Sequence, residues 1–408
     1  MVNKLQTLVI AVGLLLLNLY ASAQTSQSLS MGPGYSIDAF YKMSDGTVIS
    51  VPANNWDIAF TTNLFDASIR LNEAKGWELY IASDDVADWD DIDTTGQAWE
   101  LLVNSDELWE EGAFNAQSSG GFNYGWGNYN PVNHGVTGSR IFIMKNLAGD
   151  VKKIVIDNMT SQGVYNFRIA NLDDTGLITG SINKMSYSSK HYVYYDITTS
   201  TVVDREPAKA DWDMVFMRYK TSVAPGQPPY LVTGVLTAPG VLVGQRTGVP
   251  SSDPGYSALT FQDNISEIGY DWKYFDMGTF TFLMEDSLAF FVQNTASEIY
   301  QMYFTSFAGS STGNLTFMIS NVLNVSTEEL SKTDIIVFPN PATEYIKIKG
   351  EGEQSTYIVE LVDMNGRVIR SAEINDQEKF SVAGVTSGTY FVRLIQAGTT
   401  TVQTLIIR

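Results

Sequence analysis

The chain has 408 residues, 44% of them hydrophobic, which is typical of a globular protein long enough for two or three domains. Its formal charge of −20 at pH 7 argues against nucleic acid as a partner, because phosphate backbones are bound by clustered Lys and Arg. The same charge disfavours adhesion to anionic membrane surfaces. The sequence contains no cysteine, so disulfides cannot stabilise the fold.

The first 23 residues have the pattern of a secretory signal peptide. Lys4 provides the positive charge, Leu8–Leu17 the apolar core, and Ala21–Ala23 a small-residue cleavage site. The apolar run is short for a membrane span, and no other stretch is long and apolar enough to be one. The chain is therefore predicted to be exported and to have no transmembrane segment.

The middle of the chain is predicted to be a tandem duplication. The pentapeptide Trp56–Phe60 returns almost unchanged at Trp212–Phe216, and two later blocks return in the same order. These blocks are Phe142–Asn146 with Phe290–Asn294, and Tyr165–Ile169 with Leu315–Ile319. Short alternating runs separated by Gly- and Pro-rich turns predict antiparallel β-structure in both copies, residues 24–180 and 181–324.

Each copy of the pentapeptide begins with a Trp-Asp pair. We expect Trp56 and Trp212 at matching buried positions. Asp57 and Asp213 have two interpretations: catalytic carboxylates, or carboxylates that accept hydrogen bonds from backbone amides at the start of a strand. The second is favoured, and no spacing in the sequence singles out two carboxylates as a glycosidase pair.

An acidic run at residues 84–93 contains a possible cation site. The fragment Asp91–Gly96 resembles the opening of a calcium loop, with oxygens at alternate positions and a Gly for the turn. Asp91 and Asp93 are therefore weak calcium candidates. The twelfth position of such a loop, which requires a bidentate Glu, is Leu102, so a solvated acidic loop is the favoured interpretation.

One helix is predicted in the first copy, because Trp99, Leu102, Val103 and Trp109 lie at helical spacing between residues 98 and 109. No segment of the second copy has convincing helical periodicity.

Residues 118–135 are rich in Gly, Asn and aromatic residues, which predicts a loop. Aromatic side chains on such a loop either stack on a sugar or flat ligand, or cover the end of a sheet. The chain has two histidines, one at the end of this loop and one at the start of the second copy. The candidate ligand-binding residues are Tyr124, Trp126, Tyr129, His134 and His191.

After a polar linker at residues 325–333, residues 334–408 have the pattern of a small β-sandwich. This module resembles the type A C-terminal sorting domain of the Bacteroidota type IX secretion system. The resemblance rests on the Phe338–Pro341 opening, the Val362–Arg367 hairpin and the Ser387–Arg393 strand. The candidate sorting residues are Pro339, Asn340, Pro341, Asn365, Gly366, Gly388, Tyr390 and Arg408.

This resemblance implies a route and a set of partners. The chain is expected to cross the periplasm and then the outer membrane through the type IX machinery. A C-terminal signal peptidase is expected to remove the module, leaving the rest of the chain released or attached to surface lipopolysaccharide.

The two repeats resemble the HmuY-like haem-binding family of the same phylum more loosely. The shared features are an aromatic strand, a Gly-Thr-Val-type turn and the Trp-Asp-Ile-Ala-Phe strand start. The resemblance implies an antiparallel β-fold and haem, or a similar flat apolar ligand, as cofactor. It also implies two axial ligands to the iron, and His134 and His191 do not occupy equivalent positions in the two copies.

The sequence lacks the patterns of common enzymes. It has no cysteine nucleophile, and neither a Gly-Xaa-Ser-Xaa-Gly elbow nor a phosphate loop occurs in a suitable context. We therefore expect an exported, all-β, non-enzymatic protein with no metal site. Three functions stay open: binding of haem or a flat apolar ligand, glycan binding or adhesion through residues 122–130, and a structural role at the surface.

Overall fold

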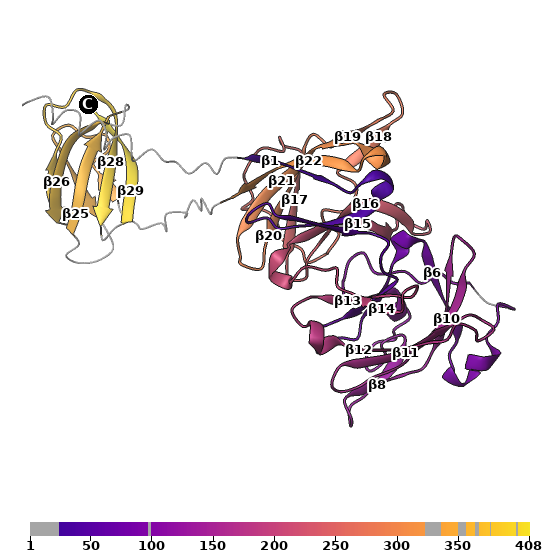
Figure 1. Cartoon of the computed structure of the whole chain (residues 1–408). Helices are drawn as coiled ribbons and strands as arrows, with labels where there is room; N and C mark the ends of the chain where they lie inside the picture. The colour runs from indigo at the N-terminus through magenta and orange to yellow at the C-terminus, as the bar shows by residue number, and fades with distance from the viewer. Residues whose placement is uncertain are drawn as a thin grey trace, which may run out of the picture. The chain divides into compact units, whose positions relative to one another are not determined.

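A computed structural model describes residues 24–96, 99–322, 336–349, 356–363, 367–375, 377–396 and 399–408. The predicted signal peptide (1–23) and the predicted linker (325–333) lie outside these residues. The chain divides into two compact units, residues 1–323 and 324–408, which we call the body and the C-terminal module. Both consist mainly of antiparallel strands, so the predicted all-β fold is confirmed (Figure 1).

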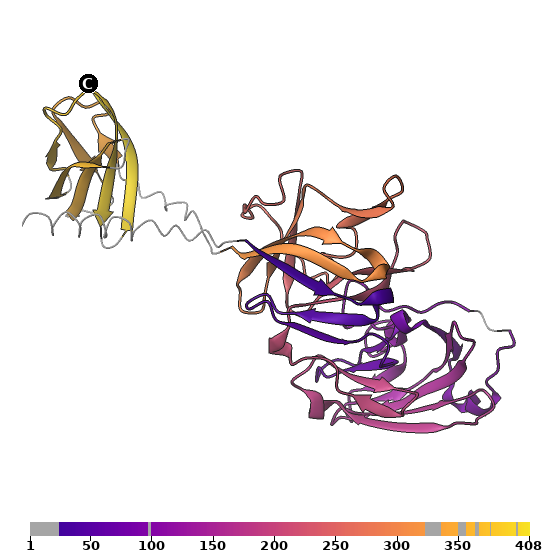
Figure 2. The same ribbon diagram turned by 45° about the horizontal axis from the view of Figure 1, so that its top comes forward.

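The body contains two β-sandwiches (Figure 2). The first combines a seven-stranded sheet with the four-stranded sheet β14-β13-β4-β5, and their facing side chains form one core. Its strands are β4 (Ile58–Thr61), β5 (Ile69–Leu71), β6 (Trp77–Ser83), β7 (Gly127–Asn130), β8 (Gly135–Gly138), β9 (Ile141–Asn146), β10 (Val151–Met159), β11 (Val164–Ala170), β12 (Ile178–Asn183), β13 (Tyr192–Asp196) and β14 (Thr201–Val203).

The second sandwich combines the five-stranded sheet β1-β22-β21-β20-β17 with the four-stranded sheet β16-β15-β2-β3. Its strands are β1 (Thr25–Ser30), β2 (Ile37–Tyr41), β3 (Val48–Pro52), β15 (Met214–Thr221), β16 (Tyr230–Thr237), β17 (Leu242–Thr247), β20 (Leu288–Gln293), β21 (Ile299–Phe307) and β22 (Asn314–Asn321). The strands β18 (Lys273–Asp276) and β19 (Thr281–Met284) form a separate hairpin between β17 and β20 in the sequence.

The helices of the described residues are short 3-10 turns. They are η1 (Pro33–Tyr35), η2 (Glu73–Lys75), η3 (Val86–Asp91), η4 (Ala113–Asn115), η5 (Lys184–Tyr187), η6 (Lys209–Asp211) and η7 (Gly309–Ser311). Residues 99–109 contain no helix, so that prediction is wrong. Leu102 instead makes a β-bridge with Leu79, and the side chain of Asn104 donates to the Leu71 carbonyl at 2.8 Å, so this segment is held extended beside other strands.

The two predicted copies exchange their hairpins. In the first sandwich, β4 of the first copy pairs with β13 of the hairpin β13–β14 from the second copy. In the second sandwich, β15 pairs with β2 of the hairpin β2–β3 from the first copy. The registers are equivalent, because Ile58 lies opposite Tyr195 and Met214 lies opposite Tyr41. Each copy therefore completes the sandwich of the other.

The two sandwich cores contain equivalent aromatic contacts. Phe60 stacks on Phe167 with ring centroids 5.3 Å apart, and Phe167 makes a T-shaped contact with Tyr195 at 5.0 Å. Burying rings of this size contributes about 1.5–3 kcal/mol each. The equivalent contacts in the second sandwich are Phe216–Phe317 at 5.8 Å and Phe317–Tyr41 at 5.2 Å.

The carboxylates of the two Trp-Asp pairs fasten the exchanged hairpins. Asp57 Oδ2 accepts a hydrogen bond from the Ile197 backbone N–H at 2.7 Å. Asp213 Oδ2 accepts one from the Met43 N–H, also at 2.7 Å. Ile197 and Met43 are equivalent, because each lies two residues after the tyrosine that pairs with the first residue of β4 or β15. The backbone-amide interpretation is therefore confirmed for both carboxylates.

Both Trp residues are buried, as predicted. Trp56 makes a T-shaped contact with Tyr194, and Trp212 makes one with Phe40, with centroids 5.0 Å apart in each pair. Tyr194 and Phe40 lie at equivalent positions of the exchanged hairpins, so the two indoles have matching environments. These rings belong to one core cluster that joins the sheets containing β13 and β15 and so packs the sandwiches against each other.

The C-terminal module has two sheets around its own core. One is three-stranded, in the order β23-β24-β27, and the other is four-stranded, in the order β26-β25-β28-β29. The strands are β23 (Ile336–Phe338), β24 (Tyr345–Lys349), β25 (Thr356–Val362), β26 (Val368–Asn375), β27 (Lys379–Ser381), β28 (Gly388–Gln396) and β29 (Thr399–Ile407). This is the small β-sandwich that the alternation of apolar residues predicts.

Candidate functional site

The five candidate ligand-binding residues do not form one cluster. Trp126 is fully buried and donates from Nε1 to the Ala67 carbonyl at 2.8 Å, so it is a core residue. Tyr124 packs against the same core. His191 lies on the other side of β4, with its ring 5.6 Å from that of Trp212. The other two candidates, Tyr129 and His134, do lie together.

Tyr129 and His134 meet at the surface, on the hairpin β7–β8. The Tyr129 hydroxyl and His134 Nδ1 are 2.7 Å apart, and their rings are 6.2 Å apart. Phe122, which is 59% exposed, lies 5.7 Å from the Tyr129 ring. We call Phe122, Tyr129 and His134 the first aromatic hairpin. It is a contiguous strip of ring side chains beside the amide side chains of the loop.

Asn130 builds the turn that holds this strip. Its side-chain oxygen accepts from the Val132 N–H at 2.9 Å, and its carbonyl accepts from the His134 N–H at 2.8 Å. His134 has φ of 55°, in the left-handed region that non-glycine residues rarely adopt. The turn places the imidazole beside Tyr129.

The hairpin β18–β19 repeats this geometry in the second copy. The Asp276 side chain accepts from the Gly278 N–H at 3.2 Å, and its carbonyl accepts from the Phe280 N–H at 2.9 Å. Phe280 has φ of 56°, and its ring lies 6.5 Å from that of Phe275. Phe280 and Met277 are 72% and 71% exposed. We call Phe275, Met277 and Phe280 the second aromatic hairpin.

The second aromatic hairpin was not predicted from the sequence, although the sequence contains a signal for it. An aromatic residue followed directly by Asn or Asp, and then by another ring four positions later, occurs at Tyr129, Asn130 and His134. The same spacing recurs at Phe275, Asp276 and Phe280.

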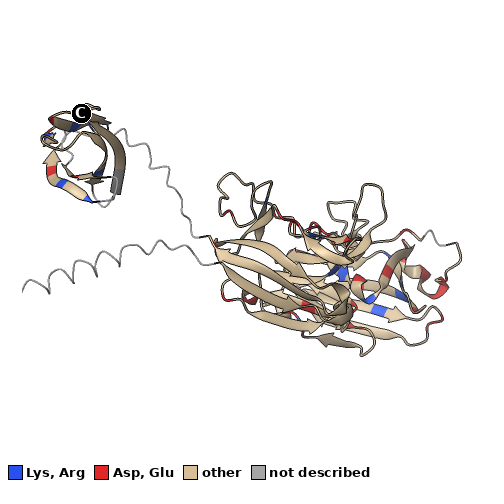
Figure 3. Cartoon of the chain, turned by 90° about the horizontal axis from the view of Figure 1, so that it is seen from above, with Lys and Arg blue, Asp and Glu red and all other residues tan. Residues whose placement is uncertain are grey.

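The two aromatic hairpins differ in charge. Residues 127–138 include no Asp, Glu, Lys or Arg. In the second hairpin, Lys273 turns inward and donates to the Thr233 carbonyl at 2.6 Å, and burial lowers its pKa to about 7. Asp276 accepts hydrogen bonds from Thr279 that lower the pKa of its carboxyl group, so this side chain is ionised near pH 7 and the second hairpin carries one negative charge. In Figure 3 the Lys and Arg positions of the body are scattered in short separate segments. The first aromatic hairpin therefore suits an uncharged partner.

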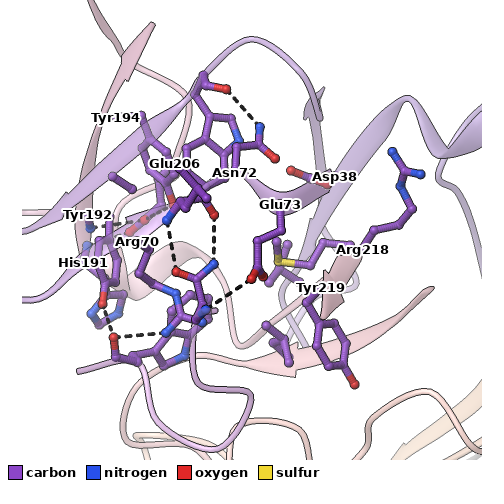
Figure 4. Close-up of a pocket in the computed structure, with 18 of the residues that line it drawn as sticks. Asp38, Arg70, Asn72, Glu73, His191, Tyr192, Tyr194, Glu206, Arg218 and Tyr219 are labelled. Carbon is purple, nitrogen blue, oxygen red and sulfur yellow. Dashed lines mark hydrogen bonds between the residues drawn. The ribbon is translucent and has the colours of Figure 1, made fainter. Parts of the chain in front are cut away.

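A narrow cavity of about 40 Å³ lies between the two sandwiches (Figure 4). Two of its acidic side chains are hydrogen-bonded: Asp38 Oδ2 accepts from Arg205 at 2.6 Å, and Glu206 accepts from the Tyr194 hydroxyl at 2.8 Å. The volume suits two or three water molecules, since one needs about 10–15 Å³. Pockets for small molecules have about 300 Å³ or more. This cavity is a polar joint between the sandwiches, and a porphyrin does not fit in it.

His191 borders this cavity and also a wider surface groove. Burial lowers the pKa of His191 to about 4, so the imidazole is neutral near pH 7. Its backbone N–H donates to Glu206 at 2.6 Å, and burial raises the pKa of that carboxyl group to about 7. The groove has a volume of about 450 Å³ and also includes Leu64, Met185 and Lys209.

The acidic run forms a turn. Residues 86–91 make up η3, capped by the Asp85 side chain, which accepts from the Ala87 N–H at 2.9 Å. Asp91 ends this turn, and Asp93 Oδ1 accepts from the Thr95 N–H at 2.7 Å. Across the described ranges, no three His, Cys, Asp or Glu side chains gather closely enough to hold a metal ion.

In the C-terminal module, the opening motif covers the free edge of the last strand. Asn340 donates from Nδ2 to the Thr404 carbonyl at 2.8 Å and accepts at Oδ1 from the Ile406 N–H at 2.9 Å. The Ala342 N–H donates to the Ile406 carbonyl at 2.8 Å, and the Arg408 N–H donates to the Ala342 carbonyl at 2.9 Å. Because β29 is an edge strand, this segment protects an edge that would otherwise pair with another chain.

The other candidate sorting residues take different positions. Pro339 and Pro341 flank Asn340 and are exposed, and neither has an N–H to add to a ladder. Gly388 begins β28, and the buried Tyr390 donates from its hydroxyl to the Thr386 carbonyl at 2.8 Å. Asn365 and Gly366 lie outside the described residues.

Comparisons with known proteins bear on the C-terminal module. No curated protein matches the chain. A solved structure titled "Biofilm associated protein - BSP domain" aligns at 8% identity over 95% of this chain and 81% of that chain. The TM-score of this alignment is 0.16, which is too low to show a shared fold. Among the residues that the structure describes, no helix is both long and apolar enough to span a bilayer. Residues 336–408 match the family described as "Secretion system C-terminal sorting domain", so the predicted sorting domain is confirmed and the protein is secreted or displayed at the cell surface through type IX secretion.

Proposed function

We propose that the exported body is a non-enzymatic binding protein that contacts an uncharged glycan through the first aromatic hairpin. The observation that carries this proposal is the strip of Phe122, Tyr129 and His134, in which Phe122 and His134 are exposed and Tyr129 is half-buried. Ring faces pack on the apolar faces of sugars, while the Tyr129 hydroxyl and the imidazole provide polar contacts. The neighbouring residues Asn128 and Asn130 are exposed and add amide groups.

A glycan array tests this proposal. The chain without its signal peptide should bind a subset of neutral glycans, and Phe122→Ala and Tyr129→Ala should each weaken binding by roughly threefold to tenfold, since one aromatic contact is worth about 0.5–1.5 kcal/mol. Phe65→Ala is the matched control, because this ring is 88% exposed and belongs to the turn after β4, not to the strip. Equal binding by all three variants would refute the proposal, as would the absence of any bound glycan.

Haem, or a similar flat apolar ligand, is a second candidate, favoured by the position of His191. A neutral imidazole is the form that binds iron, and His191 borders a groove that also contains the Met185 thioether. Titration with haemin should then give a shifted Soret band that His191→Ala abolishes and His134→Ala leaves unchanged. If no band appears at micromolar protein, or if His191→Ala leaves it unchanged, this candidate is rejected.

We also propose that the C-terminal signal peptidase of the type IX machinery removes the module and that the body stays attached to surface lipopolysaccharide. The sorting domain supports this route. Cell fractions should contain a body that lacks residues 336–408 and carries added mass. An unmodified body found entirely in the medium would contradict the attachment.

A further inference from the structure

We propose that the second aromatic hairpin is a second glycan-binding element, so that the body cross-links two chains of an uncharged polysaccharide. This rests on the function proposed for the first aromatic hairpin. It assigns a role to Phe275, Met277 and Phe280, which belong neither to the cavity between the sandwiches nor to the C-terminal module.

The two hairpins lie at equivalent places in the order of strands. β7–β8 lies between β6 and β9, and β18–β19 lies between β17 and β20. β9 and β20 contain repeated blocks of the predicted duplication, so the hairpins occupy the same place in the sequence of the two predicted copies. Each has an Asn or Asp that builds the turn, and a ring at φ near 55° that meets the first ring of the hairpin.

The second aromatic hairpin holds the exposed ring of Phe280 on a strained backbone. A bulky residue such as Phe in the left-handed region costs roughly 1–2 kcal/mol. Phe280 adopts this conformation although its ring is not buried, so packing does not repay the strain. Tyr274 and Phe275, which are also exposed, extend the apolar surface along the same hairpin. An exposed apolar patch held in a rigid turn is typical of a binding surface.

The two aromatic hairpins lie far apart on the body (Figure 1). Figure 1 shows β18 and β19 at one end of the body and β8 at the other. Two binding elements at opposite ends can each hold a different polymer chain. A partner built from repeated units suits a protein that presents a similar element twice, and the absence of charged residues from 127–138 favours a neutral polymer.

Light scattering with soluble neutral polysaccharides tests the proposal. The chain without its signal peptide is mixed with dextran, laminarin and galactomannan, and binding to short oligosaccharides of the same sugars is measured separately. We expect scattering that rises and then falls as protein is added in excess, because excess protein occupies each chain singly.

The deciding variant is the double substitution Met277→Ala with Phe280→Ala. It should keep oligosaccharide binding at the first aromatic hairpin within about twofold, while scattering falls by roughly tenfold or more. Phe65→Ala should scatter as the unaltered chain does, and an unchanged thermal midpoint shows that each variant folds. If the unaltered chain binds oligosaccharide without scattering, or the double variant scatters normally, cross-linking is refuted. If no sugar binds at all, the function proposed for the first hairpin fails as well.

Discussion

Removing the Asp57 carboxylate should destabilise the body more than removing the equivalent Asp213. Asp57 accepts from Trp77 Nε1 at 2.5 Å and from the Ile197 N–H, and it pairs with Lys75 Nζ at 2.6 Å. Asp57→Ala leaves two buried donors and an ammonium group without their acceptor, at about 1–3 kcal/mol for each donor. We therefore expect a loss of about 3–5 kcal/mol in the free energy of unfolding.

Asp213→Ala should lower the free energy of unfolding by only about 1–3 kcal/mol, because the Asp213 side chain accepts from one donor, the Met43 N–H. Burial also raises the pKa of Asp213, which shows that its ionised form is already penalised by desolvation. Urea unfolding followed by Trp fluorescence measures both losses, and the shared hairpins predict one cooperative transition. Asp204→Ala, at an exposed ion pair, is the control and should cost less than about 1 kcal/mol. Equal losses for Asp57 and Asp213, or a larger loss for Asp213, would refute this reasoning.

The pKa of Glu206 rises from 4.5 to about 7 in the folded body, so stability should fall as pH rises from 4.5 to 7, and Glu206→Gln should remove that fall. The pKa of His191 drops from 6.5 to about 4, so stability should also fall as pH drops from 6.5 to 4, a loss that His191→Gln removes; thermal midpoints between pH 4 and 8 measure both. Asn340→Ala should speed hydrogen exchange at the amides of β29 several-fold while the amides of β25 stay protected, and equal rates would contradict the edge contact. Trp56→Ala and Trp212→Ala should each cost about 3–5 kcal/mol, and a difference above about 2 kcal/mol in urea unfolding would show that their sites do not match.

Local sequence patterns predicted the features that depend on neighbouring residues. Alternation of apolar residues gave the strands, and the repeated Trp-Asp pair gave two buried indoles and two carboxylates bonded to backbone amides. The helix predicted at residues 98–109 was wrong, because the spacing of apolar residues did not reveal that Leu102 and Asn104 pair with other strands.

The exchange of hairpins was not predictable in this way. Which strand β4 pairs with depends on the contacts of Tyr195 and Ile197, about 140 residues away, and no local pattern encodes that partner. The aromatic loop was predictable only in part. Sequence could not separate Trp126, which fills the core, from Tyr129 and His134, which reach the surface, because all three lie in the same Gly- and Asn-rich stretch.

Deletion of residues 336–408 tests most directly whether the C-terminal module directs export. The chain without residues 336–408 is expressed in a type IX-competent host, and periplasm, surface and medium are assayed for the body. Because the body folds around its own cores, it should accumulate in the periplasm in soluble form, while the full-length chain reaches the surface or the medium. Efficient appearance of the truncated body outside the cell would contradict the assignment.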